Sequence, residues 1–151
     1  MRKWLVIVDD TPECMNAMRY AARRAQKTGG GIVLLYVILP DELQHWAGVA
    51  ELMHQEARDN AEERLGELAT ELQTLSGVMP EFVIREGKPA EEALTLIREE
   101  PEIGVLVLGG AEGETPGPLV TQLVVKGGGK MPIPVTVVPG GMSLERIDAV
   151  S

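Results

Sequence analysis

Two acidic residues and one glycine-rich segment are the parts of this chain whose types and spacing could do chemistry. Asp9 and Asp10 directly follow one apolar run, and the glycines of residues 109–113 follow another. A carboxylate at a strand end can accept a phosphoryl group or hydrogen bonds from a ligand, and glycine lets the backbone approach a ligand closely. If the two segments meet in the fold, they predict either a phosphoacceptor site or a nucleotide site.

The phosphoacceptor interpretation needs two further residues that this chain lacks. A receiver domain of that type pairs its acids with an aspartate after the third strand and a lysine after the fifth. Arg85-Glu86 and Pro139-Gly140 stand at those two places. For Asp9 and Asp10 this leaves two interpretations open. In one, a carboxylate orients toward the base or sugar of a nucleotide. In the other, Asp10 helps to cap the next helix, Asp9 is solvated, and the distant glycines only supply a turn.

Familiar catalytic motifs are missing from the sequence. The turn Asp9-Asp10-Thr11-Pro12 contains no glycine, which argues against a dinucleotide fingerprint. The triple glycine before Lys130 precedes a strand instead of a helix, unlike a Walker loop. Cys14 lies inside a helix with no base nearby in sequence, so we expect a small core residue. We therefore expect a binding protein and not an enzyme.

Composition limits the partners and the compartment. The chain has 151 residues, which suits one domain, and a net charge of −9. A negative field of this size disfavours nucleic acid and anionic membrane surfaces. A single cysteine fits a reducing compartment. We see neither a signal-peptide core nor a run of about 18 apolar residues, so we expect a cytoplasmic protein.

Apolar runs alternate with helical patterns along the whole chain. Runs without polar alternation predict strands buried on both faces, and the alternation predicts an α/β fold with a parallel sheet. We expect five strands in the order 3-2-1-4-5, which places Asp9 beside residues 109–113 where the winding reverses. The basic face of the first helix is expected to be solvated, and residues 142–151 to form a polar tail. The expected strands are 4–8, 32–38, 82–84, 105–108 and 132–138, with helices near 12–28, 46–75, 90–100 and 119–125.

Six short pieces of the chain have an order and spacing that are typical of one protein family. They are Leu5-Val6-Ile7-Val8-Asp9-Asp10-Thr11, Ala21-Ala22-Arg23-Arg24-Ala25, Leu34-Leu35-Tyr36-Val37, Gly87-Lys88-Pro89-Ala90, Val107-Leu108-Gly109 and Pro132-Ile133-Pro134-Val135. Through them the chain resembles the universal stress protein family over nearly its whole length, from Lys3 to about Gly140. The resemblance implies an adenine nucleotide alpha hydrolase-like fold over residues 1–141 and a stress-response role with an unknown protein partner. It also implies a homodimer formed by the last strands, here Val135-Thr136-Val137-Val138.

One branch of this family binds ATP through a glycine motif, Gly-x-x-Gly, nine residues, then Gly and Ser or Thr. By resemblance, Asp9 and Val37 contact the adenosine. Gly110 and Gly113 match the first half of the motif. This similarity predicts an adenine nucleotide, ATP with Mg²⁺, in the crevice between the ends of strands one and four.

The second half of the motif is not matched, because nine residues after Gly113 the chain has Leu123-Val124 in place of Gly and Ser or Thr. Gly117 and Thr121 are the substitutes that a small shift of the loop would bring to a phosphate. Two glutamates at positions 112 and 114 oppose a phosphate, unless a divalent ion or nearby lysines offset them. The alternative is therefore a dimeric interaction module whose crevice binds no nucleotide. The segment around Trp46 either covers the crevice or begins the long second helix.

Overall fold

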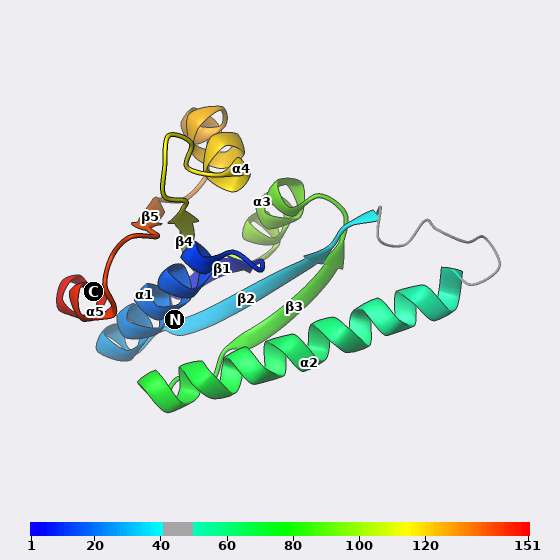
Figure 1. Ribbon diagram of the computed structural model, residues 1–151, viewed down its shortest axis with the longest axis horizontal. Helices are drawn as coiled ribbons and strands as arrows, with labels where there is room; N and C mark the ends of the chain where they lie inside the picture. Colours follow the sequence, from blue (N-terminus) through cyan, green and yellow to red (C-terminus); the bar gives the residue numbers. More distant parts are fainter. Residues whose placement is uncertain (41–49) are drawn as a thin grey trace.

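The computed structural model describes residues 1–40 and 50–151, and it contains alternating strands and helices (Figure 1). The helix predicted from residue 46 is described from Ala50, so the expectation for the segment around Trp46 lies outside the described residues. In chain order the elements are β1 (Lys3–Val8), α1 (Pro12–Thr28), β2 (Gly31–Ile38), α2 (Ala50–Ser76), β3 (Glu81–Glu86), α3 (Pro89–Glu99), β4 (Ile103–Gly110), α4 (Pro118–Val120), the π-helix η2 (Thr121–Val125), the 3-10 turn η3 (Gly128–Lys130), β5 (Val135–Pro139) and α5 (Leu144–Val150).

The five strands form one parallel sheet in the predicted order, β3-β2-β1-β4-β5. The central strands are apolar throughout because both of their faces are covered. Leu5 and Val6 on β1, and Leu106 and Val107 on β4, are fully buried although they alternate between faces. β3 and β5 lie at the two edges of the sheet, where the predicted strand order placed them.

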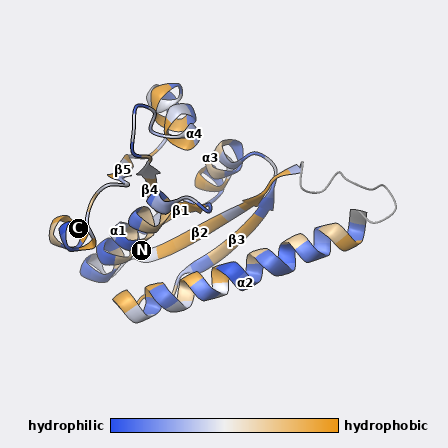
Figure 2. Ribbon diagram, in the orientation of Figure 1, coloured by the Kyte–Doolittle hydropathy of each residue, from blue (hydrophilic) through white to orange (hydrophobic). Residues whose placement is uncertain are grey.

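Each face of the sheet has its own core. On one face, α1, α2 and α5 pack against the sheet through side chains such as Met18, Leu65 and Ile147. On the other face, α3 and the segment formed by α4 and η2 pack against it through Leu96 and Leu123. Figure 2 shows the apolar colour concentrated on the strands, while much of α2 is hydrophilic. The result is a three-layer α/β arrangement.

Two of the boundaries that differ from the prediction bear on the site. Gly109 and Gly110 were expected in a loop, but they pair with Val138 and Pro139 as the last residues of β4. The last strand was expected from Pro132 and begins at Val135. The first difference arises because β5 extends to Pro139 and holds the end of β4 in the sheet. The second agrees with the absence of an N–H on Pro132 and Pro134, which cannot donate to a neighbouring strand.

The C-terminal segment is not a polar tail. It forms α5, whose Ile147 is fully buried in the core. Asp148 accepts hydrogen bonds from the guanidinium groups of Arg19 and Arg23, at 2.8 and 3.0 Å to its Oδ1. These two arginines hold the pKa of the Asp148 carboxyl well below its usual range. The basic face of α1 was therefore wrongly expected to be solvated, because all four of its cations bond to the C-terminal segment: Arg19, Arg23, Arg24 and Lys27.

Candidate ligand-binding site

Two adjoining cavities lie where β1 and β4 end. The larger, of about 320 Å³, opens between the ends of β1 and β2 and the start of α4, and its lining includes Asp9, Val37 and Leu119. The smaller, of about 60 Å³, continues toward β4 and the start of α1, and its lining includes Gly109. The two cavities share Ile7, Asp9, Pro118 and Leu119. The reversal of strand order thus brings the first acid and the start of the glycine segment to one place.

Gly109 lets α1 begin directly against the end of β4. A Cβ at this position would lie 2.3 Å from the carbonyl oxygen of Glu13 and 2.5 Å from its carbonyl carbon. Backbone atoms cannot yield as a side chain can, so only glycine fits. This contact places the first turn of α1 at the rim of the smaller cavity.

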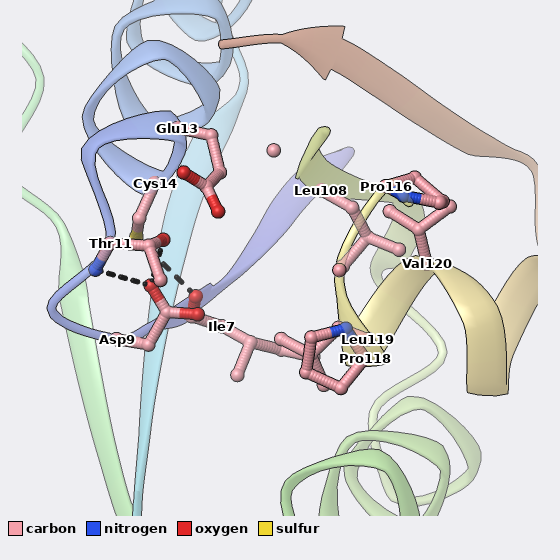
Figure 3. Close-up of a pocket in the computed structure, with 12 residues that line it drawn as sticks. Ile7, Asp9, Thr11, Glu13, Cys14, Leu108, Pro116, Pro118, Leu119 and Val120 are labelled. Atoms are coloured by element: carbon pink, nitrogen blue, oxygen red, sulfur yellow. Dashed lines mark hydrogen bonds between the residues drawn. The ribbon is translucent and has the colours of Figure 1, made fainter. Parts of the chain in front are cut away.

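Asp9 is held in a local turn. Its carboxylate accepts hydrogen bonds from the backbone N–H of Thr11, at 3.0 Å, and from the Thr11 hydroxyl (Figure 3). Thr11 occupies the N-cap position of α1, but its side chain makes no capping hydrogen bond because it donates to Asp9. Asp9 is partly exposed, and these local hydrogen bonds orient its carboxylate.

Three of the six predicted site residues line these cavities. Asp9 lines both, Val37 lines the larger one, and Gly117 lines the smaller one. Val37 is buried at the end of β2, so it presents an apolar surface to the larger cavity. These three residues come from β1, β2 and the loop before α4.

The other three lie elsewhere. Gly110 is paired in the sheet, and its carbonyl accepts a 2.7 Å hydrogen bond from the N–H of Gly140. Gly113 has a φ of 110°, so its role is that of a turn residue. The hydroxyl of Thr121 donates to the carbonyl of Gly117 at 2.9 Å, which closes the first turn after that glycine.

Sequence reasoning missed the contribution of the short helix after the loop. Pro118, Leu119 and Gln122 line the larger cavity from that side. Leu119 and Gln122 are three residues apart, so they share a helix face. This spacing was a usable signal, but Thr121 was the one residue of the predicted helix that the sequence analysis named for the site.

Cys14 is a core residue, as predicted. Its thiol lies 3.5 Å from the carbonyl oxygen of Ile7 and can donate to it, and burial raises the pKa of the thiol to about 12. A thiol with that pKa stays protonated near neutral pH, so Cys14 does not act as a nucleophile.

The charged side chains that line the two cavities are all acidic. The smaller cavity is lined by the carboxylates of Asp9 and Glu13, and the described residues that line either cavity include no lysine or arginine. Within residues 1–40 and 50–151, no three His, Cys, Asp or Glu residues gather in a way that could hold a metal ion. In the same part of the chain, none of the helices is long and apolar enough to cross a lipid bilayer.

Comparison with known proteins places this arrangement in context. The sequence model of the universal stress protein family matches residues 1–139. The structure is similar to universal stress protein UspA from Lactobacillus plantarum, with 24% identity, a TM-score of 0.72, and 91% of this chain and 97% of that chain covered. A search of curated proteins finds no significant match.

Two further similar structures are complexes with an adenine nucleotide. One is a universal stress protein in complex with cAMP, with 14% identity, a TM-score of 0.56, and coverage of 93% of this chain and 98% of that one. The other is the universal stress protein from Archaeoglobus fulgidus in complex with dAMP, with 17% identity, a TM-score of 0.62, and coverage of 91% and 97%. At these identities the similarity shows the fold.

Proposed function

The chain belongs to the universal stress protein family, and from that premise we propose that it binds the adenosine part of an adenine nucleotide. The observation that carries the proposal is the cavity of about 320 Å³ at the ends of β1 and β2, where Asp9 and Val37 meet. These are the two residues that the family resemblance assigned to adenosine. They are distant in sequence and line one cavity.

The size and chemistry of the cavity suit a nucleoside. Its volume lies at the lower end of the range of about 300–1,000 Å³ that is typical of small-molecule pockets. Ile7, Val37 and Leu119 supply apolar surface for a flat aromatic base. Asp9 and Gln122 supply hydrogen-bonding groups for the hydroxyl groups of a sugar or the edge of a base.

We propose adenine as the base because of the ligands that related proteins bind. ATP with Mg²⁺ is the ligand implied by the family resemblance, and cAMP and dAMP are named for the two related structures. All of these share the adenosine or deoxyadenosine group that the larger cavity suits. We therefore expect recognition of the nucleoside part by this chain.

The proposed role is a cytoplasmic stress-response protein that binds its ligand without turnover. It would act as a homodimer through β5, where Val137 is 38% exposed on an edge strand. An uncovered edge strand with apolar side chains is a liability, which pairing with a second copy removes. A protein partner would then bind the dimer according to whether the dimer holds its ligand.

A second candidate function is a dimeric interaction module that binds no nucleotide. The position of Gly110 favours it, because this motif residue is paired in the sheet and is not among the residues that line the two cavities. The two candidates differ in one observable property, which is saturable binding of an adenine ligand.

Titration calorimetry with adenosine, cAMP, AMP and ATP tests the proposal. We expect binding by the natural sequence and a loss of at least about tenfold in Asp9→Ala, because a charged group that accepts a hydrogen bond contributes about 1.5–3 kcal/mol. Gln122→Trp changes an exposed residue at the cavity mouth and should obstruct binding without altering the core. Glu71→Ala, an equal change of charge at an exposed position on α2, is the control and should bind normally.

Absence of binding by all four ligands would refute the proposal and support the interaction module. Binding that survives both Asp9→Ala and Gln122→Trp would place the ligand elsewhere. Release of phosphate from ATP at a rate that scales with protein concentration would contradict the expectation of no turnover.

A further inference from the structure

We propose that this site selects adenine ligands by charge: it accepts a nucleoside or a singly charged cyclic monophosphate and rejects di- and triphosphates. The inference rests on the proposed function and names the class of ligand within it. It follows from what surrounds the smaller cavity, into which the phosphate groups of a ligand held at Asp9 and Val37 would extend.

The first argument is volume. The smaller cavity has about 60 Å³, enough for only a few water molecules. It is bounded by Leu108, Pro116 and Val120 across from the first turn of α1 (Figure 3). This space holds one phosphate group at most, so the further groups of a triphosphate would have to lie outside it.

The second argument is charge. Asp9 and Glu13 both bring carboxylates to the rim of the smaller cavity, on its α1 side (Figure 3). Among the described residues, no ion pair neutralises either of them, and Lys126 and Lys130 are not among the lining residues. A phosphate at this point would therefore face two negative charges.

The third argument concerns hydrogen-bond donors. Helix starts usually offer free N–H groups to phosphates, but here α1 begins at Pro12 and α4 at Pro118, and proline has no N–H. The N–H of Thr11 donates to Asp9, and the N–H of Cys14 donates to the carbonyl of Thr11 at 3.2 Å. Two residues at these helix starts thus lack an N–H, and two further N–H groups are already bonded within the protein, which reduces the number of donors for a polyphosphate.

These three features act on phosphate groups and not on the nucleoside. A like charge at about 4 Å weakens binding roughly fivefold in a water-like medium, and about a thousandfold at an effective dielectric constant near 20. Each additional phosphate adds such a contact, while adenosine has none. We therefore expect affinity to fall in the order adenosine, cAMP, AMP, ATP.

The test measures the same four ligands by calorimetry against the natural sequence and Glu13→Gln, in EDTA and again with excess Mg²⁺. Glu13→Gln removes one charge and keeps the side-chain length. We expect it to raise the affinity for ATP at least about fivefold and to leave the affinity for adenosine unchanged. Glu71→Gln, on the exposed face of α2, changes the net charge equally and should alter neither.

The outcomes separate this inference from the proposed function. Equal affinity for ATP and adenosine in the natural sequence, with or without Mg²⁺, overturns charge selection and leaves adenosine binding intact. An ATP affinity that Glu13→Gln does not change overturns the role of Glu13. If none of the four ligands binds, the proposed function fails and this inference fails with it. Circular dichroism that matches the natural protein shows that the variant is folded.

Discussion

Replacement of Gly109 by alanine tests the contact that brings α1 to the cavity. The added Cβ would lie 2.3, 2.5 and 2.9 Å from three atoms of Glu13, namely its carbonyl oxygen, carbonyl carbon and Cβ. Ordinary contacts lie at 3.4–4 Å, so either the first turn of α1 or the end of β4 must move by about 1 Å. Both are backbone segments that the sheet and the helix hold in place.

Overpacking of this kind costs about 1–3 kcal/mol. For a chain of this length, each kcal/mol lowers the melting temperature by about 2–4 °C, so we expect a decrease of roughly 2–12 °C. The shift should also move Glu13 away from the smaller cavity and so reduce the difference in affinity between adenosine and ATP, because one of the two carboxylates at the rim is displaced.

Gly104→Ala on the same strand is the matched control. Its Cβ would meet only the Arg2 side chain, at 3.2 Å from Cγ, and that side chain can move. We expect its stability to change by no more than about 1 kcal/mol, since alanine also lowers the entropy of the unfolded chain. Thermal unfolding followed by circular dichroism measures both variants. Equal melting temperatures for Gly109→Ala and Gly104→Ala would refute the packing argument.

Four further predictions concern the C-terminal helix, the buried thiol and the edge strand. Ile147→Ala should lower the free energy of unfolding by about 2–5 kcal/mol, because the side chain is fully buried; a change below half a kcal/mol, measured in urea, would mean that α5 is not part of the core. Asp148→Asn should cost about 1 kcal/mol at pH 7, a value discounted because the carboxylate is 32% exposed. The pKa of Asp148 is lowered in the folded protein, so its carboxylate stabilises the fold above the unfolded pKa of about 3.9, and this stabilisation is lost as pH falls further. A difference in unfolding free energy between the natural protein and Asp148→Asn that stays constant down to pH 2 would contradict this. Cys14 should react with iodoacetamide only as fast as the protein unfolds, since burial raises the thiol pKa to about 12, and fast labelling of the folded protein would disprove it. Val137→Lys should shift the mass measured by light scattering from twice the chain mass to 16.3 kDa, whereas a natural sequence already monomeric at micromolar concentration would exclude the β5 dimer.

The sheet could be predicted from the sequence because its signals are local and redundant. Each central strand is an apolar run without polar alternation, and each helix between strands begins or ends at a proline or glycine, as at Pro12 and Gly29. Handedness rules then leave few strand orders. The position of Asp9 next to β4 followed from the order alone.

The C-terminal helix could not be predicted as part of the core because its partners are distant in sequence. Asp148 binds Arg19 and Arg23 across more than 120 residues of chain, so no local pattern indicates the contact. One local signal existed, since Ser143 caps the helix by accepting a hydrogen bond from the N–H of Arg146. A serine before a short polar segment was too weak to indicate burial of Ile147.

The sequence predicted that Asp9 and Val37 lie close together, but it did not predict where Gly110 lies. Asp9 and Val37 lie at strand ends, and strand ends are fixed by the sheet. The glycine motif depends on where β4 stops, and β4 continues to Gly110 because β5 pairs with it as far as Pro139. The spacing of the glycines in the sequence does not show which of them are paired in the sheet.

The most direct test of the account is to map adenosine onto the protein by NMR. In a titration of the ¹⁵N-labelled chain, we expect the amide signals of Asp9, Val37 and Leu119 to move together and to saturate with one affinity. A separate cavity of about 300 Å³, lined by residues that include Trp4 and Gly30, serves as an internal comparison, and the amide signals of its lining residues should not move. Shifts confined to that separate cavity, or no shifts at saturating adenosine, would contradict the assignment of the ligand site.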